Sequence, residues 1–294
     1  MDLIEIAYKP PYDWRTMMSF LESHAVAGVE VVDRPNGCYS RTLLGAGGTS
    51  GWLSVCNNEQ SSRLIITVSP ALAAQASSIT ALVRRAFDTD VDPLAISAQL
   101  GPLAAANPGL RLPGVFDGFE LAVRTILGQQ VTVRAGTTMA TRLARKFGEP
   151  FTAAPPGLAL ALDLFTPTAM RLAAASLEDF TSLGIIQSRA RAIMALAAAV
   201  ADGRISLTVD SDAELLAEQL KSLPGIGEWT AQFVTMRLLA VADSFPSRDL
   251  VIKKAAGETD EKILLAMAEK WRPWRSYAAM HLWKSAAKSL NRRD

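Results

Sequence analysis

The spacing of hydrophobic residues changes about one third of the way along the chain. Residues 1–93 contain short runs in which apolar and polar positions alternate or β-branched residues cluster, with Gly, Asn, Pro and Ser between them. This pattern predicts strands of an antiparallel sheet, at Leu3–Ala7, Gly28–Val32, Tyr39–Leu44, Gly51–Val55 and Leu64–Val68. Helical spacing at Trp14–His24 and Ala71–Phe87 predicts two helices in the same unit.

From about residue 92 onward every periodic segment has helical spacing. Short apolar stripes separated by Gly, Pro and small polar residues predict helices with tight turns, at Leu94–Leu100, Phe119–Gln129, Val131–Phe147, Thr168–Ala174, Leu177–Leu183, Ser188–Ala201, Glu228–Ala240, Asp260–Lys270 and Arg275–Ala287. Asp117 with Glu120 has the spacing of a capping box, and Ser211 with Glu214 is expected to begin a further helix. The pattern therefore predicts an α+β chain in which a small antiparallel sheet precedes an all-α core.

Composition narrows the class of protein. The chain has 294 residues, of which 49% are hydrophobic, enough for two or three core-forming units. The amino-terminal segment has no long apolar region of a signal peptide, and no uncharged apolar run is long enough to cross a membrane. Cys38 and Cys56 are too few for a disulfide framework and lack the spacing of metal ligands. We therefore expect a cytoplasmic protein with reduced thiols.

Charge is balanced overall but unevenly placed. The formal net charge is only +1, which does not indicate a nucleic-acid-binding protein. Residues 1–93 carry 7 Lys/Arg and 10 Asp/Glu, a net of −3, whereas residues 248–294 carry 11 and 6, a net of +5. The basic carboxyl-terminal part suits a polyanion, although a solvated terminal helix would have the same composition.

The stretch from Leu223 to Asp249 contains the most informative motif. Its hairpin, Leu-Pro-Gly-Ile-Gly, breaks the preceding helix and lets the backbone approach another surface closely. The helix that follows begins with free N–H groups, which together with the glycines form a site for a phosphate. From the hairpin residues alone, an ordinary corner between two helices is the favoured alternative.

The sequence LPGIGEWTA, followed about twenty residues later by an Asp that opens an apolar helix, resembles the signature of the helix-hairpin-helix Gly/Pro-Asp DNA glycosylase superfamily. Within it, the chain resembles the alkylbase glycosylases of the 3-methyladenine DNA glycosylase II family. Further segments resemble that family in the same order, and the resemblance covers nearly the whole chain: PPYDW at 10–14, NPGLRLPGVFDGFELAVRTILGQQV at 107–131, FTPTAMRLAAAS at 165–176 and WRPWRSYAAMHLW at 271–283.

The resemblance implies three structural units. An α+β amino-terminal domain would comprise residues 1–93. A helical subdomain containing the hairpin would comprise 118–241. A second helical subdomain would combine 94–117 with 242–294, and a cleft would lie between the two helical parts.

The resemblance makes Asp249 the catalytic candidate. An ionised carboxylate near the anomeric carbon can stabilise the positive charge that develops when a glycosidic bond breaks, and it can orient water. Asp249 is also placed to cap the helix that follows it, and both roles are compatible. Arg248 stands where relatives carry a second acid.

Trp229 separates two mechanisms. Relatives that also nick the strand have a Lys two residues after the second glycine of the hairpin, which forms a Schiff base. An indole cannot do so, and the chain lacks the four cysteines that hold an iron–sulfur cluster in several such relatives. We therefore expect a hydrolase without lyase activity, without a cofactor and without a catalytic metal.

Family correspondence also implies a base pocket and DNA contacts. An alkylated purine is cationic and should stack on electron-rich rings, for which the candidates are Trp229, Phe233, Trp283 and Phe20. Gln130 would be the wedge that fills the gap left by a flipped nucleotide. The hairpin residues expected at the DNA backbone are Leu223, Gly225, Ile226, Gly227 and Thr230. Carbonyl groups of Lys221, Leu223 and Gly225 would hold a structural monovalent cation.

The function expected from these residues is excision of alkylated bases from damaged double-stranded DNA by a monomer. The lesions would be 3-methyladenine, 7-methylguanine and other N- or O2-alkylated bases, removed by base flipping and Asp-assisted hydrolysis in base-excision repair. A catalytically inert helix-hairpin-helix DNA-binding module is the alternative, and Asp249 together with Trp229 argues against it. Lys284, Arg272, Arg275 and Lys253 are weaker candidates for phosphate contacts.

Overall fold

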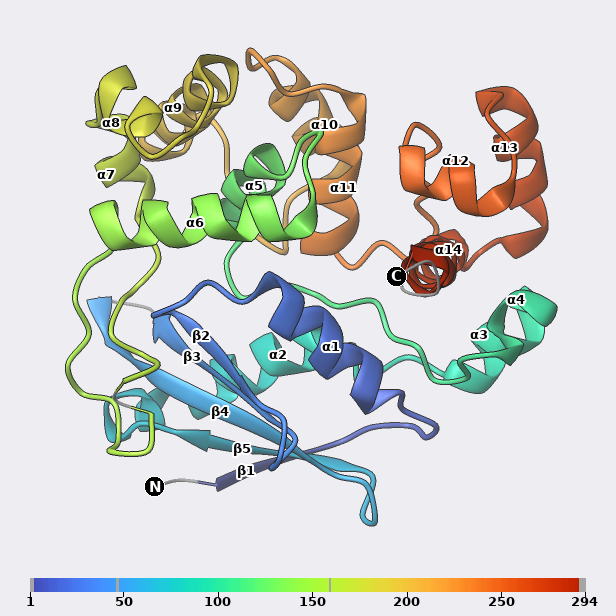
Figure 1. The fold of residues 1–294 in the computed structure, drawn as a ribbon. Coiled ribbons are helices and arrows are strands. Elements are labelled where there is room, and N and C mark those ends of the chain that lie inside the picture. The colour runs from blue at the N-terminus through green and yellow to red at the C-terminus, as the bar shows by residue number, and fades with distance from the viewer. Residues whose placement is uncertain (1–2, 46–47, 159, 291–294) are drawn as a thin grey trace.

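The computed structural model describes residues 3–45, 48–158 and 160–290 (Figure 1). The amino-terminal part forms a five-stranded antiparallel sheet with strand order β1-β5-β4-β3-β2. The strands are β1 (Leu3–Ala7), β2 (Glu30–Asp33), β3 (Cys38–Leu44), β4 (Ser50–Asn58) and β5 (Arg63–Val68). The predicted antiparallel sheet is confirmed, with small shifts at the strand ends.

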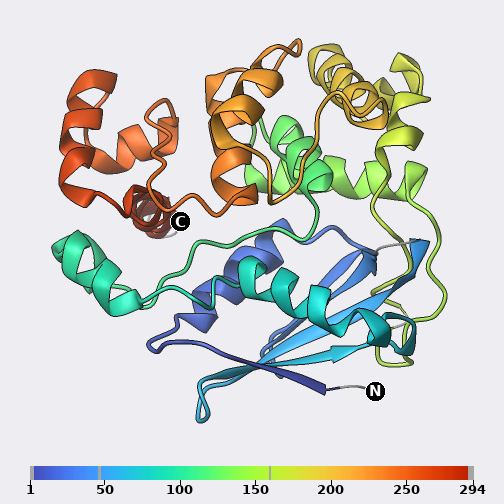
Figure 2. The ribbon, with the colours of Figure 1, turned by 180° about the vertical axis from the view of Figure 1, so that it is seen from behind.

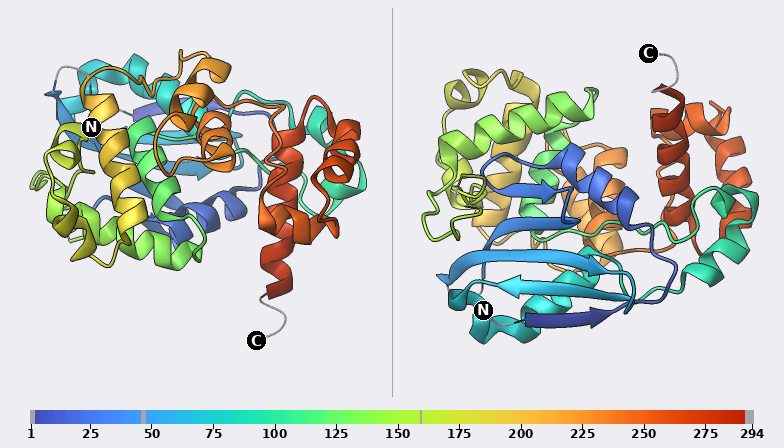
Figure 3. Two further views of the ribbon diagram at one scale, coloured as in Figure 1. Left: turned by 90° about the horizontal axis from the view of Figure 1, so that it is seen from above. Right: turned by 60° about the horizontal axis from the view of Figure 1, so that its bottom comes forward.

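Two helices pack on one face of this sheet. Alternate residues of β5, such as Leu64 and Ile66, are fully buried together with Met17 of α1 (Trp14–His24) and Val83 of α2 (Ala76–Ala86). The right view of Figure 3 looks onto the other face, where the strands lie in front of these helices. The helix predicted at Ala71–Phe87 is divided, because a 3₁₀ segment, η2 (Pro70–Gln75), precedes α2.

The two cysteines form a disulfide bond. Cys38 on β3 lies directly opposite Cys56 on β4, and the pair is bonded. The expectation of two reduced thiols is therefore wrong for this structure. Two cysteines cannot form a framework, but the register of adjacent strands, which the sequence alone did not specify, places them side by side.

The helices after the sheet form two groups (Figures 1 and 2). One group comprises α5 (Gly118–Leu127), α6 (Val133–Phe147), α7 (Ala169–Ala173), α8 (Leu177–Thr181), α9 (Gln187–Ala201), α10 (Ala213–Lys221) and α11 (Glu228–Leu238). The other comprises α3 (Pro93–Leu100), α4 (Pro102–Ala105), α12 (Leu250–Ala256), α13 (Glu261–Ala268), η3 (Glu269–Trp271) and α14 (Arg275–Leu290). Each group has its own buried apolar cluster. The exact domain bounds stay a prediction.

Two predicted helix starts need correction. Asp212, rather than Ser211, caps α10, and its carboxylate accepts from the Leu215 N–H at 2.8 Å. Asp117 caps α5 as expected, but the Glu120 side chain does not complete a capping box. It turns instead to two arginines in the protein interior.

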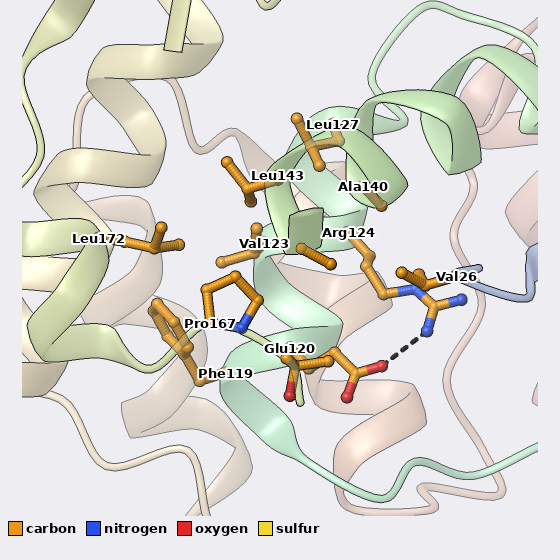
Figure 4. Close-up of a pocket in the computed structure, with 12 residues that line it drawn as sticks. Val26, Phe119, Glu120, Val123, Arg124, Leu127, Ala140, Leu143, Pro167 and Leu172 are labelled. Carbon is orange, nitrogen blue, oxygen red and sulfur yellow. Dashed lines mark hydrogen bonds and ion pairs between the residues drawn. The ribbon is translucent and has the colours of Figure 1, made fainter. Parts of the chain in front are cut away.

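These arginines belong to a buried ionic cluster that joins the sheet to α5. Arg41 of β3 contacts Glu120 at 2.7 Å, and Arg124 contacts Glu120 at 2.7 Å and Glu30 of β2 at 3.0 Å. Figure 4 shows the Glu120–Arg124 pair beside a cavity of about 30 Å³ lined mainly by Val123, Leu143 and other apolar residues. A space of this size holds one water molecule, so it is not a site for a base.

Asp88 links the amino-terminal unit to both the following loop and α14. Its carboxylate accepts from the Leu112 N–H at 3.0 Å and from the Tyr277 hydroxyl at 2.9 Å. Burial raises the pKa of Asp88 to about 6, although both hydrogen bonds and Arg111 lower it. The ionised form is thus disfavoured in the folded protein.

Because the folded-state pKa lies above the unfolded value, the folded protein binds more protons, and Asp88 reduces stability as pH rises from about 4 to about 6. We expect Asp88→Asn to remove this loss, since Asn also tolerates the left-handed backbone at φ 52°. Relative to wild type, the variant should gain up to about 3 kcal/mol of unfolding free energy between pH 4 and pH 7.5. Urea denaturation at both pH values tests this, with the exposed cap variant Asp260→Asn as control. An equal difference at both pH values would contradict it.

None of the helices within the described ranges is long and apolar enough to cross a membrane. The same ranges contain no group of three or more His, Cys, Asp or Glu side chains arranged to hold a metal ion.

Candidate functional site

The hairpin between α10 and α11 is tightly packed on one side and open on the other. Gly225 has φ +79°, and a Cβ there would lie 2.9 Å from the Cβ of Ala192 in α9, so a side chain is excluded. Gly227 caps α11, and nothing lies within 4 Å of its Cβ position. The first N–H groups of α11 lack acceptors inside the helix, as at any helix start. The hairpin therefore presents backbone donors and the positive end of a helix dipole.

The turn between α5 and α6 is tied to this hairpin. The Gln129 side chain donates to the Gly225 carbonyl and to the Thr230 hydroxyl, each at 3.0 Å. Arg189 of α9 donates to the Gln129 carbonyl. Sequence reasoning did not single out Gln129 or Arg189, because neither carries a pattern that distinguishes it from a surface residue.

Gln130 lies at the tip of the same turn. The helix predicted to reach Gln129 ends at Leu127, and α6 begins at Val133 rather than Val131. Gln130 is exposed and has φ 55°, in the left-handed region that few residues other than Gly, Asn and Asp adopt. The chain thus reverses at Gln130 and directs an unburied side chain away from the helices.

The carboxylate of Asp249 is held by four N–H donors. As the N-cap of α12, its Oδ1 accepts from the backbone of Val251 at 2.8 Å and Ile252 at 2.9 Å. The Trp283 indole of α14 donates to Oδ1 at 3.2 Å, and the Trp229 indole of α11 donates to Oδ2 at 2.9 Å. All four partners are donors, so the group acts purely as an acceptor, as an ionised carboxylate does.

The two oxygens of Asp249 are not equivalent. Among the residues that the structure describes, Oδ1 has three donors and Oδ2 has one, the Trp229 indole, and each carboxylate oxygen can accept about two hydrogen bonds. Oδ2 therefore keeps an acceptor direction for a water or a substrate atom. The side chain is 8% exposed and has lost most of its contact with bulk water. A charge in this position acts more strongly than on the surface.

Three of the four aromatic candidates form one cluster beside Asp249. Phe233 stacks on Trp229 with ring centroids 5.4 Å apart, and the edge of Trp283 meets Phe233 at 5.8 Å. These residues come from α11 and α14, which belong to different groups of helices. Phe20 of α1 lies behind them, separated by the guanidinium of Arg237, which is over both the Phe20 and the Phe233 rings.

His24 of α1 packs against Phe20. Its ring stacks on Phe20 with centroids 4.2 Å apart, and its Nδ1 lies 2.8 Å from the Phe20 carbonyl. Burial lowers the pKa of His24 to about 4, against the effect of that hydrogen bond. His24 is therefore neutral at physiological pH.

Several basic residues proposed for phosphate contacts are engaged within the protein. Lys284 contacts Asp13 at 2.6 Å and also the Thr16 hydroxyl, which joins α14 to the start of α1. Both Arg272 and Arg275 pair with Asp243. These interactions make structural links between elements, and the phosphate contacts of Lys284, Arg272 and Arg275 stay a prediction.

Two family models together match most of the chain. Residues 3–117 match the AlkA N-terminal domain, and residues 123–264 match the HhH-GPD superfamily of base excision DNA repair proteins. The first covers the sheet and α1–α4, and the second begins within α5 and covers the turn between α5 and α6, the hairpin and Asp249.

Individual relatives agree with these matches. The chain is 36% identical to DNA-3-methyladenine glycosylase 2 of Escherichia coli (strain K12) over 94% of its own length and 95% of that protein. Its fold is similar to a 3-methyladenine DNA glycosylase from Archaeoglobus fulgidus, with a TM-score of 0.82 at 18% identity over 98% of both chains. An 8-oxoguanine glycosylase/lyase from Clostridium acetobutylicum, in complex with double-stranded DNA, gives 0.71 at 17% identity over 92% of both.

Proposed function

Because the chain belongs to the DNA-3-methyladenine glycosylase 2 family of the HhH-GPD superfamily, we propose that it excises alkylated bases from damaged double-stranded DNA. The reaction is hydrolysis of the N-glycosidic bond, and the substrates are 3-methyladenine, 7-methylguanine and other N- or O2-alkylated bases. The observation that supports this most directly is the Asp249 carboxylate held between two indoles. The protein would act as a monomer in the cytoplasm.

Binding begins at the hairpin and the wedge turn. The backbone of Leu223, Gly225, Ile226 and Gly227 and the start of α11 at Thr230 approach a phosphate of the lesion strand. Gln130 enters the duplex and fills the space of the flipped nucleotide. The Gln129 hydrogen bonds to Gly225 and Thr230 fix the distance between these two contacts.

Carbonyl groups of Lys221, Leu223 and Gly225 form the proposed monovalent cation site. Neutral carbonyl oxygens suit a hard cation, and the Gly225 carbonyl retains one lone pair beyond its bond with Gln129. The ion would link the hairpin to a phosphate and take no part in the chemistry.

Asp249 acts when the base leaves. The bond between C1′ and the base nitrogen breaks with its electron pair on the base, and positive charge develops on the sugar. Oδ2, with its open acceptor direction, stabilises that charge, and water then adds to C1′ and loses a proton. Trp229 replaces the Lys of strand-cleaving relatives, so an abasic site is the final product.

The wedge gives a testable expectation. Gln130→Ala should keep the turn but remove the side chain that fills the space of the flipped nucleotide. As a result, kcat/KM on duplex DNA should fall roughly tenfold, the effect of one lost packing and hydrogen-bonding contact. The fall should be much smaller on single-stranded DNA, where no base pair is broken. Single-turnover rates on both substrates test this, with Gln130→Leu, which supplies an apolar wedge of similar size, as control. Equal losses on the two substrates would contradict the role.

The function itself is tested by incubating the protein with methylated duplex DNA and separating the released bases by chromatography. We expect free 3-methyladenine and 7-methylguanine. DNA binding without release of any base would instead support an inert binding module.

A further inference from the structure

The buried guanidinium of Arg237 lies between the aromatic rings of Phe20 and Phe233. The Cζ of Arg237 is 5.6 Å from the centroid of Phe233 and 5.0 Å from that of Phe20. Its N–H groups donate to the carbonyls of Pro113 and Gly114. Arg237 is 7% exposed, and no carboxylate in the described parts of the chain forms an ion pair with it. Its positive charge is therefore not neutralised locally.

The position of Arg237 follows from helical spacing. Trp229, Phe233 and Arg237 succeed one another at intervals of four on α11, so they share one face of the helix. The Phe233 ring thus has the Trp229 indole one turn before it and the guanidinium one turn after it. Phe20 likewise has two partners, Arg237 and the neutral ring of His24. A fixed cation is therefore built into the aromatic stack beside Asp249.

We infer that Arg237 determines specificity by favouring neutral lesions over cationic ones, an inference that rests on the proposed function. A cationic base such as 7-methylguanine is attracted by Asp249 and repelled by Arg237, so the two charges act on it in opposite directions. The same Arg237 also competes for the negative faces of Phe233 and Phe20, which would otherwise attract the cationic base.

The two kinds of lesion also differ when the glycosidic bond breaks. A cationic base takes the bonding electron pair and leaves neutral, so it gains nothing from a nearby guanidinium. A neutral base such as hypoxanthine takes the same electron pair and leaves with negative charge, which Arg237 stabilises. In both binding and bond cleavage, Arg237 therefore favours the neutral lesion over the cationic one.

The test compares Arg237→Met and Arg237→Lys with wild type on duplexes containing one 7-methylguanine or one hypoxanthine. The measured quantity is the ratio of kcat/KM for 7-methylguanine to that for hypoxanthine, in which any loss of folded protein cancels. The ratio should rise on the order of tenfold in Arg237→Met, the size of one charge–charge interaction across a partly buried site. It should stay near the wild-type value in Arg237→Lys, which keeps the charge.

Arg111→Met is the matched control. Like Arg237, Arg111 is buried, donates to main-chain carbonyls and lies close to an aromatic ring, 4.7 Å from the centroid of Tyr12. Unlike Arg237, it contacts residues of the amino-terminal unit. Its loss should leave the ratio unchanged. The inference is overturned if Arg237→Met has the wild-type ratio, or if wild type releases 7-methylguanine but no hypoxanthine. Release of neither base by wild type would instead refute the proposed function.

Discussion

Asp249→Asn is expected to lower kcat for base release by about 10²- to 10³-fold, the effect of removing one preorganised electrostatic group from a catalytic site. The fold should survive, because Asn is as good an N-cap as Asp and its oxygen can still accept from Val251 and Ile252. What is lost is the negative charge near the sugar. The new amide group would also face the Trp229 N–H, donor against donor.

Asp260→Asn is the matched control for this variant. Asp260 caps α13 and accepts from the backbone of Lys262 and Ile263, the same arrangement that Asp249 has in α12. In the described parts of the chain, no indole donates to Asp260. Single-turnover rates and thermal unfolding of both variants separate a cap effect from a catalytic one. If Asp260→Asn loses as much activity as Asp249→Asn, or if Asp249→Asn keeps its activity, the catalytic role is excluded.

Trp229→Phe should lower kcat by roughly ten- to a hundredfold with a small change in KM, since a hydrogen bond to a charged group contributes about 1.5–3 kcal/mol. Phe can still stack on Phe233, but it no longer orients Oδ2 of Asp249. Trp229→Ala removes the ring as well and should also raise KM for DNA with a cationic base. Steady-state kinetics on methylated duplex DNA distinguishes the two effects.

Trp14→Phe controls for the loss of an indole hydrogen bond. The Trp14 indole donates to the Gly37 carbonyl at 2.9 Å and stacks on Phe87, both residues of the amino-terminal unit. Trp14→Phe should lower the stability of the protein and leave kcat unchanged. A kcat for Trp229→Phe equal to that of wild type would show that the indole does not position the carboxylate.

Much of this architecture could be predicted because local patterns determine it. Alternation in β5 and helical spacing in α1 are visible in the sequence. The hairpin, with Asp249 twenty-two residues after Gly227, forms a motif from which both the fold and the catalytic candidate are predicted. The grouping of Trp229, Phe233 and Trp283 followed from family correspondence, although Trp229 also donates to Asp249, which no spacing reveals.

The features that could not be predicted depend on contacts between distant segments. The ionic cluster joins Glu30, Arg41 and Glu120, whose pairing requires the sheet to dock on α5. The disulfide depends on strand register, and the Lys284–Asp13 pair depends on how α14 meets α1. In the sequence, Arg237 looks like any other basic residue of a helix. Its place between two aromatic rings depends on how α1 packs against α11.

The central claim is that this protein hydrolyses a glycosidic bond and leaves the DNA strand intact. The most direct measurement uses an end-labelled duplex with one 7-methylguanine, in which free base, alkali-labile sites and strand breaks before alkali are counted in the same reaction, with and without borohydride. The account predicts one alkali-labile site for each base released, no break before alkali and no protein–DNA adduct. Strand breaks before alkali, together with an adduct trapped by borohydride, would contradict it. They would indicate a lyase whose nucleophilic amine comes from a position other than 229, where this chain has Trp.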